Sequence, residues 1–391
     1  MGGSETDDRS PLMDQPLSLG AIARAKGADL LAARVLAPAQ IKVLRSIADC
    51  RTEALGGHRD QCDRCAYEHT FWNSCRDRHC PGCGAEARES WLEKRREEVL
   101  DVPYFHVVFT IPERLNALVL HAPELLYAIL LRAAGQALID VAASKLRAHI
   151  GLLTVLHTWG QTLVFHPHVH CVVPGGGFSF DGRRWVHIPT GTFLLAVKVL
   201  SRRFRTLVKN AITEAYDDGS LVIPPHIVRD RTALDLLLAC ASKTDWHSYV
   251  KPPFGGPEQV LAYLASYTHR VAISNQRITA FDGERVTFHY RDYHDGNARK
   301  SMELPAVEFL GRFLMHVVPA RFTRIRYYGF LANRDRSANI EKARALIGSI
   351  RKLTPRAPAP DPRLCPQCHQ GTMRTRAKID PQRPRTWFDS S

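Results

Sequence analysis

The sequence predicts a mixed α+β protein that divides into two or three domains. With 391 residues, the chain is long enough to form more than one hydrophobic core. Strand-like runs and two hairpin signals alternate with helical patterns through the middle of the chain. Six of the ten cysteines lie between Cys50 and Cys83. This clustering indicates a small metal-stabilised module that precedes a larger, cysteine-poor domain.

The expected elements follow from local patterns. Apolar residues at helical spacing predict helices in five segments: residues 17–49 (two helices, broken near Pro38), 85–100, 123–150, 193–216 and 258–269. Strand-like runs cover residues 104–111 and 152–173, and Asp181-Gly182 and Asp282-Gly283 mark hairpins. We expect domains at residues 1–100 (helical arm and zinc-binding region), 101–335 (main domain) and 336–391 (basic tail).

The charge of the chain points to a polyanionic partner. Lys and Arg total 53 against 39 Asp and Glu, which gives a net charge of +14. Nucleic acid is the usual partner of so basic a protein, although basicity without any such partner is the simpler alternative. No apolar run is long enough to span a bilayer, and the acidic start MGGSETDDRSPLMDQ is unlike a secretory signal. We therefore expect a cytoplasmic protein with no membrane partner.

Two Cys-x-x-Cys pairs carry the strongest metal signal. Each pair lets two thiolates approach one ion from a tight turn, so Cys62, Cys65, Cys80 and Cys83 are expected to form one tetrahedral zinc site. A redox pair would not need the second Cys-x-x-Cys. The remaining donors nearby either form a second zinc site or bind nothing: Cys50, His58, Cys75 and His79. Near the end of the chain, Cys365, Cys368 and His369 supply at most three further ligands.

The run Val164–Val173 predicts a second kind of metal site. In a strand, alternate side chains share a face, so His168 and His170 point the same way, with backbones roughly 7 Å apart. Both imidazoles could then reach one divalent ion. His166 precedes Pro167, which cannot donate a hydrogen bond to a neighbouring strand, so we expect His166 to lie outside the regular pairing.

Tyr263 and Tyr267 are four residues apart and would share one face of the helix expected over residues 258–269. Two tyrosines alone would more often be part of an amphipathic core stripe. A metal-binding strand and a basic surface in the same domain favour the alternative that the phenols are nucleophiles. A phenol with an ordinary pKa near 10 attacks poorly at neutral pH unless a metal activates the phosphoryl group.

Taken together, five segments resemble the IS91 family of rolling-circle transposases, which are two-tyrosine members of the HUH (His-hydrophobic-His) single-strand endonucleases. The segments are CRTEALGGH, NSCRDRHCPGC, HTWGQTLVFHPHVHCVVPGGG, YLASYTHRVAISN and RIRYYGFLANR, which extend from Cys50 to Arg334. The resemblance implies an α+β nuclease domain with a central antiparallel sheet flanked by helices, preceded by a zinc-binding DNA-recognition region. It also implies that His168 and His170 bind the catalytic magnesium or manganese and that Tyr263 and Tyr267 are the nucleophiles.

The implied reaction is a nick in single-stranded DNA at an element end through a 5′-phosphotyrosine link, followed by transfer of the strand to a target. For the third metal ligand, His269 and Gln161 rank first, ahead of His106 and His157. Arg270 is a candidate phosphate contact, and the basic helix offers Arg202, Arg203 and Arg205 as a DNA surface. No nucleotide-binding loop of the P-loop type occurs in the chain, so host replication or helicase proteins are expected to unwind the DNA.

Two other functions compete with this interpretation. A non-enzymatic zinc-ribbon DNA-binding regulator would share the charge and the cysteines, but it gives no reason for alternating histidines and paired tyrosines. A transposase that uses three carboxylates and two metals would need a different set of residues, and no spacing of carboxylates in the sequence indicates one.

Overall fold

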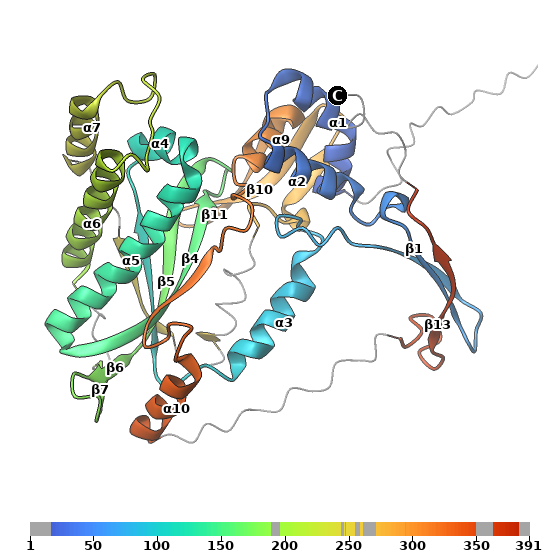
Figure 1. Cartoon of the computed structure of the whole chain (residues 1–391). Coiled ribbons are helices and arrows are strands. Elements are labelled where there is room, and N and C mark those ends of the chain that lie inside the picture. The colour runs from blue at the N-terminus through green and yellow to red at the C-terminus, as the bar shows by residue number, and fades with distance from the viewer. Residues whose placement is uncertain are drawn as a thin grey trace, which may run out of the picture.

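The computed structural model describes residues 17–188, 196–243, 246, 248–254, 259–260, 271–293, 295–348 and 363–382. Its helices are α1 Leu19–Ala33, α2 Pro38–Asp49, α3 Gly84–Arg96, α4 Asn116–His121, α5 Pro123–Leu146, α6 Val197–Asp217, α7 Arg231–Lys243, α9 Ala306–Leu314 and α10 Arg336–Ile347. Single 3-10 turns lie at Glu53–Leu55, Glu113–Leu115 and Asn275–Arg277. The strands belong to three antiparallel sheets (Figure 1). The expected α+β class is confirmed.

A seven-stranded sheet forms the centre of the molecule. Its strands are β3 Tyr104–Thr110, β4 Ala148–Trp159, β5 Phe165–Pro174, β6 Gly176–Ser179, β7 Trp185–His187, β8 Ser248–Phe254 and β12 Ile325–Gly329. They are arranged in the order β7-β6-β4-β5-β3-β8, and β12 also pairs with β4. The two longest strands, β4 and β5, are therefore neighbours at the middle of the sheet, and β6 and β7 form the hairpin that Asp181-Gly182 predicts.

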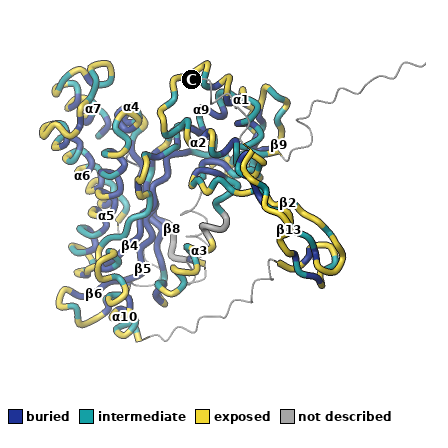
Figure 2. Tube along the Cα trace, turned by 45° about the vertical axis from the view of Figure 1, so that its right-hand side comes forward, coloured by how far each residue is buried: buried dark blue, intermediate teal, exposed yellow. Residues whose placement is uncertain are grey.

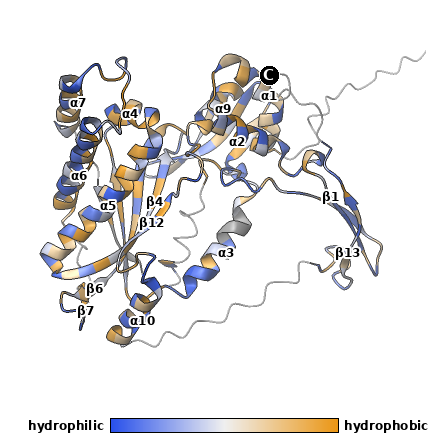
Figure 3. Ribbon diagram, viewed as in Figure 1, coloured by the Kyte–Doolittle hydropathy of each residue, from blue (hydrophilic) through white to orange (hydrophobic). Residues whose placement is uncertain are grey.

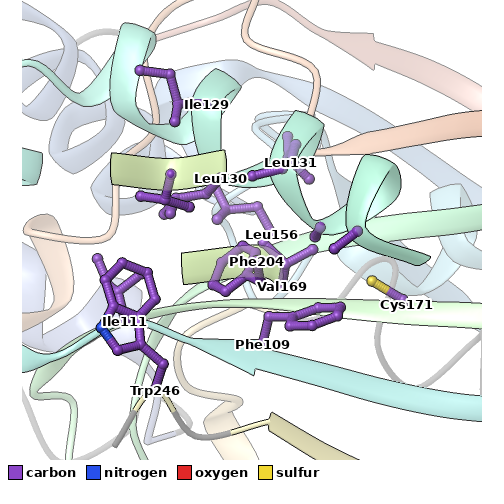
Figure 4. Packing of buried hydrophobic residues seen from close by; sticks show 14 of the residues in the cluster. Phe109, Ile111, Ile129, Leu130, Leu131, Leu156, Val169, Cys171, Phe204 and Trp246 are labelled. Atoms are coloured by element: carbon purple, nitrogen blue, oxygen red, sulfur yellow. The ribbon is translucent and has the colours of Figure 1, made fainter. Parts of the chain in front are cut away.

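Helices α5, α6 and α7 cover one face of this sheet (Figure 1). Phe109 of β3 and Phe204 of α6 have ring centroids 4.7 Å apart, and Val169 of β5 lies in the same core (Figure 4). Among the described helices, α5 alone is long and apolar enough to cross a membrane, but 67% of its apolar window is buried inside the molecule. Its length and composition are thus accounted for by packing against the sheet.

The opposite face of the sheet has its own, smaller cluster of buried residues. Val155 of β4 and Val172 of β5 pack there with Ile340 of α10, Phe330 and Val260. Trp91 and Leu92 of α3 contact the same cluster from its margin. This face carries the alternating histidines, because Val172 is two residues from His170 along β5.

The amino-terminal helices belong to a separate core with a later segment of the chain. β9 Ile278–Phe281, β10 Arg285–Asp292 and β11 Ala298–Pro305 form a second sheet, in the order β11-β10-β9, that is followed by α9. Phe288, Phe309 and Leu314 from this unit pack with Leu19, Ile22 and Leu44 of α1 and α2. Contacts therefore cross the boundary expected at residue 100.

The third sheet is an arm at the side of the molecule, composed of β13 Met373–Ile379, β1 Gly57–Cys62 and β2 Glu68–Trp72 in that order. Most of its side chains are exposed or partly exposed, as Figure 2 shows. Figure 3 shows hydrophobic residues concentrated in the central strands, whereas β1 and β13 are mostly hydrophilic. The arm joins strands from both ends of the chain, so contacts also cross the boundary expected at residue 336.

Candidate metal centres and the histidine face

Three histidines converge on one face of the central sheet. His168 and His170 lie on β5, and His157 on β4 is the direct cross-strand neighbour of His168. The ring centroids of His157 and His170 are 4.5 Å apart, and those of His168 and His170 are 4.8 Å apart. One nitrogen from each of the three rings lies within 4.8 Å of the others. The three imidazoles can therefore share one metal ion.

Neighbouring groups orient two of these rings. Nδ1 of His168 donates a hydrogen bond to the carbonyl oxygen of His166, at 2.7 Å. Nδ1 of His170 is 2.8 Å from Nε2 of His106, which lies on β3 and is 2% exposed. When Nδ1 carries the proton in both rings, Nε2 is left as the metal-binding nitrogen. His106 thus belongs to the support of the site.

The third histidine of the cluster is not one of the two residues that the sequence ranked first, His269 and Gln161. His157 occupies the third position, whereas Nε2 of Gln161 donates to the hydroxyl of Tyr293 at 2.9 Å. His157 was only a secondary candidate, because its proximity depends on the register of β4 against β5. The signal that could have identified it is a histidine opposite His168 once these two strands are paired. His269, Tyr263, Tyr267 and Arg270 lie outside the described residues.

The segment that precedes the tyrosines reaches this same face. Val260 is fully buried and packs in the cluster of Val155 and Val172. Both valines are two residues from a cluster histidine on their own strands, namely His157 and His170. Val260 itself is three residues before Tyr263 in the chain.

The cysteines form two groups of four, and neither matches the expected grouping. Cys80 and Cys83 lie with Cys50 and Cys75, while Cys62 and Cys65 lie with Cys365 and Cys368. The expectation that the two amino-terminal Cys-x-x-Cys pairs share one site is therefore wrong. The physical reason is that β1 and β2 extend into the arm. Cys62 and Cys65 therefore lie far from Cys80 and Cys83 and next to the Cys365–Cys368 turn that precedes β13.

The group of Cys50, Cys75, Cys80 and Cys83 has the geometry of a zinc site. The sulfur atoms of Cys50 and Cys83 are 3.4 Å apart and those of Cys75 and Cys83 are 3.6 Å apart. Hydrogen bonds from the thiols of Cys75 and Cys80 lower the pKa of Cys50, whereas the pKa values of Cys75 and Cys80 are raised, so Cys50 is the sulfur of these three that most readily becomes a thiolate. Four sulfur ligands at these separations suit tetrahedral zinc.

The two histidines proposed for a second zinc site have other roles. Nδ1 of His79 is 2.9 Å from the carboxylate of Asp77, and its Nε2 accepts a hydrogen bond from the backbone N–H of Val318 at 3.3 Å. His58 stacks on Phe71 in the arm, with ring centroids 5.4 Å apart. Neither belongs to a four-cysteine group, so the set Cys50, His58, Cys75 and His79 does not come together.

The basic helix α6 lies on the opposite side of the sheet from the histidines, because it packs in the same core as α5. Arg203 forms an ion pair with Asp140 of α5, and Arg205 donates to the carbonyl oxygen of Ser242 at 3.1 Å. Arg202 is exposed. The helix is therefore not part of the histidine site.

Comparisons with known proteins agree with this architecture. A family described as "Putative transposase" matches residues 151–338, and a "Transposase zinc-binding domain" of the IS91 type matches residues 22–111. The chain is 45% identical over 374 residues to "Putative transposase y4qJ" of Sinorhizobium fredii, covering 91% of this chain and 94% of that protein.

A second relative is the transposase for insertion sequence element IS801 of Pseudomonas savastanoi pv. phaseolicola, which is 30% identical over 301 residues. This alignment covers 75% of the chain and 71% of the relative. No solved structure matches the chain. The zinc-binding match includes Cys50, Cys75, Cys80 and Cys83, and the other match begins within β4 and includes His157, His168 and His170. The chain therefore belongs to the IS91 family of transposases, with an amino-terminal zinc-binding domain.

Proposed function

We propose that this transposase acts by a rolling-circle mechanism and nicks single-stranded DNA at the ends of its element through a tyrosine–phosphate link. The observation that carries the proposal is the cluster of His157, His168 and His170 on the sheet face that Val260 also contacts. Val260 leads directly into the segment with Tyr263 and Tyr267. A metal ion that activates a phosphate and a phenol that attacks it are the components of a phosphoryl-transfer site of this kind.

In the proposed reaction, the hydroxyl oxygen of Tyr263 or Tyr267 attacks the scissile phosphorus. A new bond forms between that oxygen and the phosphorus, the bond to the 3′ oxygen breaks, and the 3′ oxygen takes a proton. A 3′-hydroxyl from another strand later attacks the phosphotyrosine, so the phosphodiester is restored and the phenol is released. The second tyrosine permits a further cleavage while the first remains linked. No nucleotide cofactor is needed, because the phosphotyrosine preserves the energy of the broken bond.

A divalent ion held by the three histidines would polarise the phosphate. The resemblance leaves a choice between magnesium and manganese, and three imidazole donors favour manganese, since magnesium prefers oxygen ligands. We further propose that the protein works in the bacterial cytoplasm at the nucleoid and relies on host replication or helicase proteins for single-stranded DNA.

The phenol hydroxyls are tested by changing Tyr263 and Tyr267 to Phe, which keeps the rings and removes only the oxygen. Each single variant should still form a covalent adduct with a labelled single-stranded oligonucleotide on a denaturing gel. The double variant should form none, because no nucleophile remains. An adduct in the double variant would contradict the proposal, cleavage without any adduct would favour carboxylate chemistry, and intact DNA with the unaltered protein would favour the regulator.

His106 should act as a positioning residue for His170. Replacing His106 with Phe removes the 2.8 Å contact between the two rings, so His170 is no longer held in one tautomer and orientation. We expect the affinity for Mn²⁺, measured by calorimetry, to fall about 10- to 100-fold. His106→Gln, which retains a polar side chain, should recover part of it. Unchanged Mn²⁺ binding by His106→Phe would contradict this role.

Binding to single-stranded DNA should weaken steeply as salt rises. The chain has a net charge of +14, and each Lys or Arg contact with a phosphate releases condensed counterions. A protein that makes about six phosphate contacts to single-stranded DNA should lose roughly two to three orders of magnitude in affinity between 50 and 200 mM salt. Fluorescence anisotropy across a salt series measures the slope, and an affinity that stays flat would contradict the expectation.

A further inference from the structure

We propose that Cys62, Cys65, Cys365 and Cys368 bind a second zinc ion, which assembles a single-strand DNA-binding arm from the two ends of the chain. The zinc-binding family match includes Cys62 and Cys65, but it ends at residue 111 and so does not include Cys365 or Cys368. The proposal rests on the chain being a DNA-acting transposase, and it is independent of the tyrosine and histidine chemistry.

The geometry of this group fits a metal ion better than disulfide bonds. The sulfur atoms of Cys62 and Cys368 are 3.8 Å apart, and those of Cys65 and Cys365 are 3.6 Å apart. Tetrahedral zinc with bonds of about 2.3 Å to sulfur places its ligands roughly 3.8 Å from each other. A disulfide requires about 2.05 Å. The four sulfurs are thus already at zinc-site spacing.

Backbone N–H groups donate hydrogen bonds to two of the four sulfurs. The N–H of Gly371 donates to the sulfur of Cys368 at 3.3 Å, and the N–H of Arg64 donates to that of Cys62 at 3.4 Å. Position 371 must also be glycine, because a Cβ there would lie 2.3 Å from the sulfur of Cys62.

The arm needs the ion because its own core is very small. The buried cluster consists of Cys62, Cys365 and Met373, with Tyr67 and Cys368 packed against it. β13 pairs with β1 from Gly57↔Ile379 to Cys62↔Met373, so a segment more than 300 residues away in sequence forms an outer strand of this sheet. So small a core cannot offset the entropy of closing such a long loop, whereas a metal site can.

Zinc binding brings together a row of aromatic rings and a strand of cations. The rings are those of His58, Phe71, His69 and Tyr67, which contact one another in that order at centroid distances of 5.4, 4.5 and 6.3 Å. Phe71 is 41% exposed, although a large apolar side chain usually packs against other residues. Lys378 of β13 is paired in register with His58, so it flanks the row.

β13 itself contains three exposed cations and no carboxylate: Arg374, Arg376 and Lys378. Arg374 pairs with Asp63 at 3.3 Å and Lys378 with Asp380 at 3.6 Å, so these two pairs must open when phosphates bind. The combination of rings and cations selects single-stranded DNA as the occupant. Unstacked bases can lie on exposed rings of a sheet surface while nearby cations contact the phosphates, whereas the bases of a duplex are stacked on each other and present only their edges. The charge of the strand complements a polyanion, and the rings discriminate for the single-stranded form.

The metal is tested by zinc analysis of the purified full-length protein. We expect two zinc ions per chain, and one in the double variant Cys365→Ser, Cys368→Ser. Gly371→Ala should also lose the second ion, although it removes no ligand. Cys240→Ser, which changes a cysteine outside both groups, should retain two. One zinc in the unaltered protein, or two in the double variant, would overturn the proposal.

The surface is tested by binding of a poly-dT oligonucleotide, measured by anisotropy. His69→Ala with Phe71→Ala, and separately Arg376→Gln with Lys378→Gln, should each weaken binding about tenfold or more while zinc stays at two. Arg229→Gln with Lys243→Gln removes the same charge at and near α7 and should have little effect. The double variant Cys365→Ser, Cys368→Ser should lose as much poly-dT affinity as these arm variants.

The outcomes test the DNA-binding arm separately from the proposed tyrosine chemistry. Binding that is unchanged in both arm variants, or an equal loss of duplex and single-strand affinity, would overturn the arm as a single-strand surface. At saturating oligonucleotide concentration, the arm variants should still form the covalent adduct, because the arm contributes affinity and not chemistry. A lack of adduct in the unaltered protein would instead contradict the proposed function and leave the binding result intact.

Discussion

Alanine in place of His168 or His170 should lower the rate of covalent adduct formation by at least about a hundredfold. Each imidazole is one of the three histidines that could hold an ion among the described residues, so its loss should empty the site or displace the ion. Displacement by about 1 Å is enough to cost two orders of magnitude in rate. DNA affinity should change little, because in the proposed reaction these side chains hold the ion that acts on the scissile phosphate, and they are not part of the proposed DNA-binding surface.

His149→Ala is the matched control for this experiment. His149 lies on β4, the same strand as His157, but it is exposed, and its ring contacts that of Phe180 at a tilted angle, outside the cluster. Its loss should leave both adduct formation and Mn²⁺ binding unchanged. If His168→Ala formed the adduct at the normal rate in the presence of a chelator, the histidines would have a structural role and the proposed chemistry would be wrong.

Serine in place of Cys80 should remove one zinc ion per chain and destabilise the protein by several kcal/mol. Cys80 is 3% exposed and packs in the core that also contains Trp159, Leu163 and residues of α1 and α2. A zinc ion held by its group would therefore stabilise the contact between the amino-terminal helices and the end of β4. Loss of a structural metal is among the most destabilising single changes, on the order of 4 kcal/mol or more.

Zinc analysis and thermal unfolding, with Cys240→Ser as the control, measure this effect. Cys240 is partly buried in α7, away from both cysteine groups, so its replacement by serine tests the loss of a sulfur atom without the loss of a metal ligand. A Cys80→Ser protein with full zinc content and an unchanged melting temperature would show that this cysteine is not a ligand.

Several features of the fold were predictable because they depend on neighbouring residues. Pro38 separates α1 from α2, and Asp181-Gly182 and Asp282-Gly283 connect paired strands, as expected from local backbone preferences. The alternation of His168 and His170 follows from the two-residue period of a strand. In each case the information lies within a few residues of the chain.

The partners of these local features could not be predicted in the same way. His157 becomes part of the cluster because β4 pairs with β5 in a register that places it opposite His168. The packing of α1 and α2 against α9 and the β9–β11 sheet likewise joins segments more than 200 residues apart. No periodicity within either segment indicates which other segment will contact it.

The cysteines show most clearly which features depend on local sequence and which depend on tertiary structure. By itself, the sequence determined that Cys-x-x-Cys turns would present thiolate pairs, because the spacing within a turn sets the direction of both side chains. Only the tertiary structure decided which pairs meet. β13 joins β1 and brings Cys365 and Cys368 to Cys62 and Cys65, while Cys80 and Cys83 join Cys50 and Cys75. The physical reason is that a tetrahedral site requires only four sulfurs at the right distance, and the sequence separation of the pairs does not set that distance.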